Sequence, residues 1–201
     1  MTEADQPPAA DLRRNLAQAS VGSVLAAVGA NAAQTDVLII GDGSGSGWSM
    51  GGGWAAVVVD IARNRRKLLT GAQNAATSVT MEIEPYFKAL YWYHHTTGKG
   101  LRMHLGRPPR VAVVCDNELV VRQGNGQVRA KALDPYWAAI ECVKRQAGIV
   151  CHWYWARRDT VGLNILCDHL SRHSRVAHAA HVSLAAAGLG PDTSSVYLVN
   201  P

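Results

Sequence analysis

Two acidic side chains follow apolar runs in a pattern that could bind metal ions. Asp42 comes after the run 37–40, and Asp116 comes after the run 110–115. In open α/β sheets, sites gather at the carboxyl ends of strands, so we expect both acids at one edge of a sheet. Crowded carboxylates repel each other and stay ionised around cations, and their hard oxygen atoms favour Mg²⁺ or Mn²⁺.

Two further acids accompany predicted helices. Glu82 opens a predicted helix over 81–97, and Asp168 lies in a predicted helix over 162–180. Glu84 is the alternative to Glu82, because both lie near the same turn, and we favour Glu82. Two divalent ions about 4 Å apart are suited to phosphodiester hydrolysis, so four acids in such positions indicate a nuclease.

The first two acids also have simpler structural interpretations. Asp42 beside Gly43 and Ser44 could be an ordinary turn or cap residue. Asp116, which precedes Asn117, could be a helix N-cap. The sequence around each acid, taken alone, leaves these alternatives open.

The glycines around Asp42 do not form a known phosphate-binding loop. The stretch "GDGSGSGWSMGGG" (41–53) lacks the Gly-Lys-Ser/Thr of a Walker loop and the G-x-G-x-x-G of a dinucleotide loop. We interpret these glycines as residues that let a nucleic-acid backbone approach the acid closely.

The apolar pattern predicts an α/β fold with a mixed five-stranded sheet flanked by helices. The predicted strands are 37–40, 53–61, 67–72, 110–115 and 149–155, and the first three form an antiparallel meander. The predicted helices are 81–97, a short one from 117, 134–147 and 162–180. The segment "GKGLRMHLGRPP" (98–109) is expected to be a loop. Three strands followed by alternating helices and strands give this fold class.

The chain divides into one domain with an extension at each end. Residues 1–35 are the N-terminal extension, with an amphipathic helix over 11–30. Residues 36–181 form the domain, and 182–201 are a C-terminal tail. A signal peptide is the alternative for the N-terminus, but polar residues and a glycine interrupt the apolar run that it would need.

Composition narrows the class of partner and the compartment. A net charge of +5 is compatible with a polyanionic partner. No run of 18 apolar residues is uninterrupted, so we expect no membrane span. The four cysteines have no C-x-x-C spacing and lie in apolar segments, which favours free thiols in the cytoplasm. No feature of the sequence identifies a protein partner.

Four segments, in order over about 37–176, carry a resemblance to a known family. They are "DGSGSGWSMGGGWAAVV", "TSVTMEIEPYFKAL", "VAVVCDNELVVRQG" and "LDPYWAAIECVKRQAGIVCHWYWARRDTVGLNILCDHLSR". Together they resemble the first hairpin, helix start, central strand and closing block of the ribonuclease HI family. The resemblance implies a ribonuclease H-like fold and a two-metal nuclease that cuts the RNA strand of RNA–DNA hybrids. It also implies which residues are catalytic and bind two Mg²⁺ or Mn²⁺ ions: Asp42, Glu82, Asp116 and Asp168.

The sequence departs from the family pattern where the substrate would bind. The loop "ARRDTVG" (156–162) lacks the family's usual histidine, and Arg158 is a candidate to bind the scissile phosphate instead. The family's T-N-N-R stretch is "TSVT" (77–80) here. Trp48 replaces a small polar residue and could be a stacking platform. The predicted contacts to nucleic acid are Gly43, Ser44, Trp48, Thr77, Asn117, Arg157 and Arg158.

Three functions remain as hypotheses. The first is an endonuclease that hydrolyses the RNA strand of an RNA–DNA hybrid. The second is a nuclease of the same fold that acts on DNA, as a junction resolvase or an exonuclease. The third is a non-catalytic nucleic-acid-binding module, such as a subunit of a larger assembly. The complete set of acids favours an enzyme over the third hypothesis.

Overall fold

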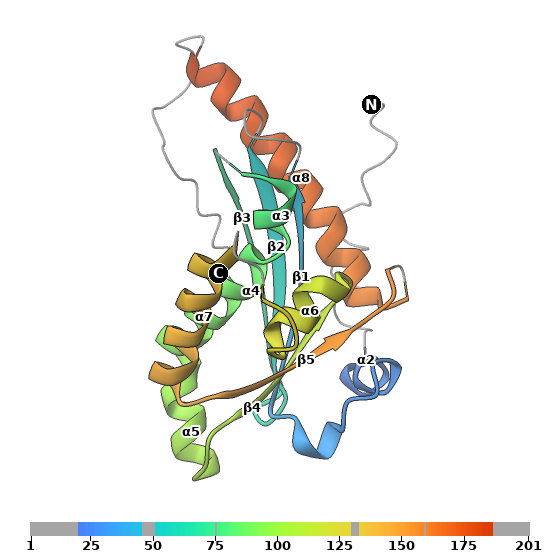
Figure 1. The fold of residues 1–201 in the computed structure, drawn as a ribbon, viewed down its shortest axis with the longest axis vertical. Helices are drawn as coiled ribbons and strands as arrows, with labels where there is room; N and C mark the ends of the chain where they lie inside the picture. Colours follow the sequence, from blue (N-terminus) through green and yellow to red (C-terminus); the bar gives the residue numbers. More distant parts are fainter. Residues whose placement is uncertain (1–19, 46–50, 75, 130–132, 159, 187–201) are drawn as a thin grey trace.

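A mixed five-stranded sheet forms the centre of the protein (Figure 1). The computed structural model describes residues 20–45, 51–74, 76–129, 133–158 and 160–186. The strands are β1 (Val37–Gly45), β2 (Gly52–Asp60), β3 (Arg65–Gln73), β4 (Arg110–Cys115) and β5 (Val150–Trp155), in the spatial order β3-β2-β1-β4-β5. The first three strands are antiparallel, whereas β4 is parallel to both β1 and β5. The predicted fold class is confirmed.

Helices accompany the sheet on both faces. They are α2 (Val21–Ala27), the 3₁₀-helix η2 (Ala32–Gln34), α3 (Ser78–Met81), α4 (Glu84–Tyr93), the π-helix η3 (His94–Gly98), α5 (Lys99–Leu105), α6 (Glu118–Gly124), α7 (Asp134–Ala147) and α8 (Gly162–Ala186). Figure 1 shows α8 crossing the strands β1 to β3 along its length, with α4 and α7 side by side. Among the described residues, no helix is both long and apolar enough to cross a membrane.

The alternation of side chains along β1 produces two separate cores. Val37 and Ile39 belong to a buried cluster that also contains Tyr86 of α4. Leu38 and Ile40 belong to a second cluster, which contains apolar residues of α2 and α8. Successive side chains of a strand point to opposite faces, so a continuous apolar run is stable only when both faces are covered.

The prediction that 98–109 is a loop was wrong. The chain continues from α4 through η3 into α5, and the helical segment ends only at Gly106, which has a left-handed φ of 64°. Gly98 is buried against the ring of Tyr93, and Leu101 is fully buried in the core. Burial of this face stabilises a helix that Gly98 and Gly100, the two glycines inside it, disfavour.

Other elements differ from the prediction in length. β1 extends to Gly45, because it pairs with β2 along its whole length. α8 continues to Ala186, past the start of the expected tail at 182. In the described part of the expected helix 11–30, α2 covers Val21–Ala27, and residues 1–19 lie outside the described residues.

Candidate active site

Three carboxylates from separate elements converge beside the end of β4. One oxygen atom from each of Asp42, Glu82 and Asp116 lies within 4.8 Å of the other two. We expected Asp42 to follow its strand, but it lies inside β1. The parallel pairing of β1 with β4 ends at the pair Ile40 and Val114. β1 then continues beyond the end of β4, so Asp42 and Asp116 come together at that end.

Glu82 reaches this cluster because α3 lies directly on β1. A Cβ atom at Gly43 would lie 1.8 Å from the carbonyl oxygen of Met81, so a glycine is needed for the two backbones to approach. Thr77 begins α3 with a capping box, in which its side chain accepts a hydrogen bond from the backbone N–H of Thr80 at 3.0 Å. The glycine thus makes room for α3, which Glu82 follows as the C-cap residue, rather than for a nucleic-acid backbone on that side. Glu82 does not open the long helix as predicted, because α4 begins only at Glu84.

Glu84 lies outside the carboxylate cluster. Its side chain is buried and pairs with Lys88 of the same helix, with 3.4 Å between Nζ and Oε1. Pro85, in the first turn of α4, packs against the backbone of Gly41. The structure therefore brings Glu82, and not Glu84, to Asp42 and Asp116.

Burial and mutual repulsion make two of these acids hard to ionise. Burial, followed by the charges of Asp116, Glu82 and Asp168, raises the pKa of Asp42 from 3.8 to about 8. Burial and the charge of Asp116 raise the pKa of Glu82 from 4.5 to about 7, although Arg158 and a hydrogen bond from Asn117 oppose the rise. Clustered oxygen donors with excess negative charge are the donor set that Mg²⁺ and Mn²⁺ prefer, so these residues fit such an ion.

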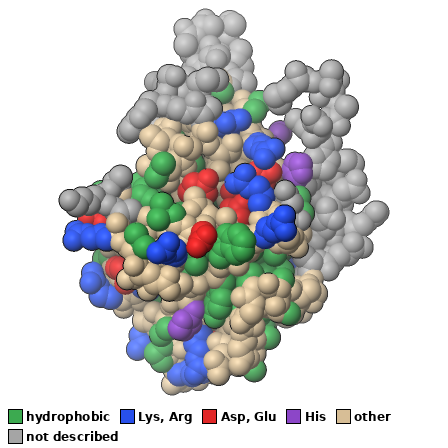
Figure 2. Space-filling model, turned by 45° about the vertical axis from the view of Figure 1, so that its right-hand side comes forward, with side chains coloured by type: hydrophobic (Ala, Val, Ile, Leu, Met, Phe, Trp, Pro, Cys, Tyr) green, Lys and Arg blue, Asp and Glu red, His purple; other side chains and the backbone are tan. Residues whose placement is uncertain are grey.

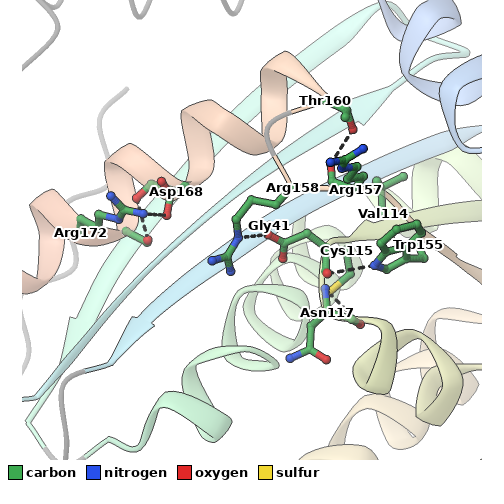
Figure 3. Close-up of polar contacts among 12 residues, drawn as sticks. Gly41, Val114, Cys115, Asn117, Trp155, Arg157, Arg158, Thr160, Asp168 and Arg172 are labelled. Atoms are coloured by element: carbon green, nitrogen blue, oxygen red, sulfur yellow. Dashed lines mark hydrogen bonds and ion pairs between the residues drawn. The ribbon is translucent and has the colours of Figure 1, made fainter.

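Asp168 stands beside the cluster on α8. Its carboxylate pairs with Arg172 one turn later, with 2.8 Å between Nη2 and Oδ1 (Figure 3). It is not one of the three acids whose oxygen atoms lie within 4.8 Å of one another. It is still close enough for its charge to raise the pKa of Asp42. The structure thus gathers three of the four predicted acids tightly and places the fourth at their side.

Arg158 forms an ion pair with one of the three clustered acids. Its Nε donates to Oδ2 of Asp116 at 2.9 Å, across the end of β4 (Figure 3). The side chain of the neighbouring Arg157 points away from that of Arg158 in the same view, and its backbone carbonyl accepts a hydrogen bond from Thr160. The two loop arginines therefore occupy different surroundings, and Arg158, the predicted contact to the scissile phosphate, is the one paired with Asp116.

The other predicted contacts to nucleic acid have structural partners of their own. The side-chain oxygen of Asn117 caps α6 by accepting from the N–H groups of Leu119 and Val120, at 3.0 and 3.2 Å. Ser44 lies in β1 opposite Gly53 of β2. Trp48 lies outside the described residues.

Two aromatic residues support the site, and sequence reasoning did not single them out. The buried Tyr86 donates its hydroxyl proton to the carbonyl of Gly41 at 2.6 Å, directly before Asp42. The indole N–H of Trp155 donates to the carbonyl of Asp116 at 3.0 Å, although the side chain is half exposed. Tyr86 follows Glu82 by four residues, a spacing typical of side chains on one face of a helix. This spacing was the one signal in the sequence that could have pointed to Tyr86.

The surface around the site carries both signs of charge. Figure 2 shows acidic side chains gathered on one face, with Lys and Arg side chains beside them. Arg158 and Arg172 pair with Asp116 and Asp168, so two of the flanking cations belong to the site itself.

Solved structures with a similar fold are ribonuclease H domains. The N-terminal RNase H domain of a Mycobacterium tuberculosis protein, solved as a fusion with maltose-binding protein, is 24% identical with a TM-score of 0.54, over 73% of this chain and 97% of that one. LC11-RNase H1, isolated from compost by a metagenomic approach, is 21% identical with a TM-score of 0.59, over 72% of this chain and 98% of that one. A structure of LC11-RNase H1 in complex with an RNA/DNA hybrid is 22% identical with a TM-score of 0.54, over 71% and 98% of the two chains.

No protein-family model matches the chain, and no curated protein sequence does. The structural likeness nevertheless extends over nearly the whole of the ribonuclease H domains. The predicted fold is confirmed: this chain has the ribonuclease H-like fold.

Proposed function

We propose that the protein is a metal-dependent endonuclease that hydrolyses the RNA strand of RNA–DNA hybrids. The observation that carries this proposal is the convergence of Asp42, Glu82 and Asp116 within 4.8 Å in a ribonuclease H-like fold. The complex of LC11-RNase H1 with an RNA/DNA hybrid supports the choice of substrate.

The four acids are the proposed ligands of two Mg²⁺ or Mn²⁺ ions. Asp42, Glu82 and Asp116 would hold the ions most directly, and Asp168 would contribute from α8. When bound, such ions activate a water molecule for attack on the phosphodiester and stabilise the charge on the leaving oxygen. The side chain of Asn117 helps to orient Glu82, and the hydroxyl of Tyr86 holds the backbone beside Asp42.

The described residues that are predicted to contact the substrate divide into three groups. Arg157 and Arg158 are cations in the loop between β5 and α8, where they can bind backbone phosphates. Thr77 and Asn117 cap short helices, so we assign them mainly to positioning Glu82 and α6. Backbone groups of Gly43 and Ser44 are the proposed contacts from β1.

A comparison of substrates tests the proposal. Purified protein with Mg²⁺ or Mn²⁺ is incubated with labelled RNA–DNA hybrid, duplex RNA, duplex DNA and a four-way DNA junction. We expect the RNA strand of the hybrid to be cut to products with 5′-phosphate and 3′-hydroxyl ends, and cutting to stop in EDTA. Preferential cutting of duplex DNA or of the junction would overturn the proposed substrate and favour a DNA nuclease. No cutting of any substrate would favour a binding module.

The cytoplasm is the proposed location. The basis is the spacing of the cysteines, which lacks a C-x-x-C pair and favours free thiols in a reducing compartment.

A further inference from the structure

An open pocket adjoins the carboxylate cluster on the side of α6. Its volume is about 460 Å³, and it is lined by Asp116, Asn117, Glu118, Leu119, Arg122 and Arg158. Asp116 belongs both to this pocket and to the cluster. A nucleic-acid strand whose phosphodiester lies at the cluster can therefore extend into the pocket with its next backbone unit.

Two guanidinium groups reach this pocket from different elements. Arg122 comes from the last turn of α6 and is exposed, and Arg158 comes from the loop before α8. Among the described residues, no ion pair within 4.0 Å involves Arg122, whereas Arg158 is paired with Asp116. Guanidinium groups match the oxygen geometry of a phosphate. Glu118 lies one turn before Arg122 and offsets part of its charge, so this pocket adds one contact rather than most of the affinity.

The pair between Arg158 and Asp116 has one buried and one exposed partner. The side chain of Asp116 is 3% exposed, and that of Arg158 is 62% exposed. The acid is therefore held in place, whereas the arginine is anchored mainly through this ion pair. Because Arg158 and a divalent cation need the same carboxylate, each weakens the binding of the other there. An Arg158 side chain released from Asp116 remains at the pocket that it already lines.

We propose that this pocket is a phosphate-binding subsite for the nucleic-acid backbone, formed by Arg122 and by an Arg158 that pairs with Asp116 until a divalent cation takes its place. The nature of the substrate rests on the proposed function. The competition for Asp116 and the contact from Arg122 can both be measured without hydrolysis.

Metal titration of the free protein tests the competition. EDTA-stripped protein, dialysed free of chelator, is titrated with Mn²⁺ in a calorimeter, without nucleic acid. We expect Arg158→Gln to bind Mn²⁺ about two- to fivefold more tightly than the parent protein, the range that loss of one ion pair with an exposed arginine allows. Arg157→Gln is the matched control and should bind as the parent does, because among the described residues no ion pair within 4.0 Å involves Arg157, and its side chain points away from that of Arg158. Unchanged or weaker binding by Arg158→Gln would overturn the competition.

Binding of nucleic acid in EDTA tests the contact from Arg122. Anisotropy of a labelled RNA–DNA hybrid is measured over a range of salt concentrations, where no hydrolysis occurs. We expect Arg122→Gln to reduce the slope of log affinity against log salt by about one, as loss of one phosphate contact does. The control is Arg145→Gln at the end of α7, which leads to the opposite end of the parallel strands. The same slope in Arg122→Gln and the parent would overturn the subsite.

The two proposals fail in different ways. If the parent protein leaves the hybrid intact in Mg²⁺, the proposed function fails, and the same salt titration with duplex DNA decides whether Arg122 contacts that backbone instead. If the hybrid is cut but neither Arg122→Gln nor Arg158→Gln behaves as expected, the subsite is wrong and the proposed function stands.

Discussion

Tyr86 and Gly41 are joined by a buried hydrogen bond of 2.6 Å from the tyrosine hydroxyl to the glycine carbonyl. The same hydroxyl lies 3.2 Å from the carbonyl of Val114 on β4. One side chain of α4 therefore contacts both strands that lead to the site, directly before Asp42 and two residues before Asp116. The carboxylates are brought together by strands that this residue links.

Replacement of Tyr86 by phenylalanine should loosen this link. The change keeps the ring but leaves the buried carbonyl of Gly41 without its donor, which costs about 1–3 kcal/mol. We expect the free energy of unfolding, measured in urea, to fall by that amount, with metal binding weakened as well. Tyr91→Phe on the same helix is the control, since Tyr91 is half exposed. Equal stability of the two variants would show that the hydroxyl does not hold the strands.

A side chain at position 43 should separate α3 from β1. In Gly43→Ala the new Cβ atom would lie 1.8 Å from the carbonyl oxygen of Met81, so the helix must move away. We expect a loss of about 3 kcal/mol in the free energy of unfolding, at the upper end of typical overpacking. Gly162→Ala is the control, because its Cβ atom meets nothing within 4 Å. A Gly43→Ala protein as stable as the control would contradict the observed contact.

The helix acid can be identified by two substitutions. Glu82→Gln should abolish hydrolysis, because Glu82 is in the carboxylate cluster. Glu84→Gln should keep most of the activity and lose only some stability, since its partner is Lys88. The measurement is the initial rate on hybrid at saturating Mg²⁺, with melting temperatures recorded for both variants. If only Glu84→Gln lost activity, the helix acid would be Glu84, and the assignment of Glu82 to the site would be wrong.

The strand acids should be indispensable for hydrolysis. We expect Asp42→Asn and Asp116→Asn each to lower the rate by at least ~10²-fold, because each removes a proposed metal ligand. Asp134→Asn is the control, since Asp134 forms an exposed pair with Arg129 and is not among the three clustered acids. Circular dichroism checks that the fold survives. A rate like that of the parent in either variant would exclude the two-metal assignment.

The metal-free protein should become less stable as the pH rises. The folded-state pKa of Asp42 is raised to about 8 from 3.8, so folding favours its protonated form. This contribution is complete below about pH 4 and is lost as the pH rises through about 8, and Glu82, raised to about 7, acts in the same direction. Urea unfolding in EDTA should show this decline, and Mg²⁺ should oppose it at the upper end. Asp42→Asn should show a smaller decline; an equal decline would mean that other groups cause it.

The sequence by itself determined the order of the strands along the chain and the acids that accompany them. Apolar runs such as 37–40 and 110–115 identify strands because both faces of the sheet are covered. The acids at positions 42 and 116 stand out because Asp116 directly follows such a run and Asp42 follows one after a single glycine. These features are local, so they can be read without the fold.

The tertiary structure decided which side chains meet. Sequence favoured Glu82 without excluding Glu84, and only the packing of α3 on Gly43 brings Glu82 to Asp42. It singled out Arg158 as a contact to the scissile phosphate, but only the loop conformation pairs Arg158 with Asp116. The helix over Lys99–Leu105 was missed for the same reason, because burial of Leu101 outweighs the local preference of the glycines. Each outcome depends on contacts between residues far apart in the chain, whose energy no local pattern records.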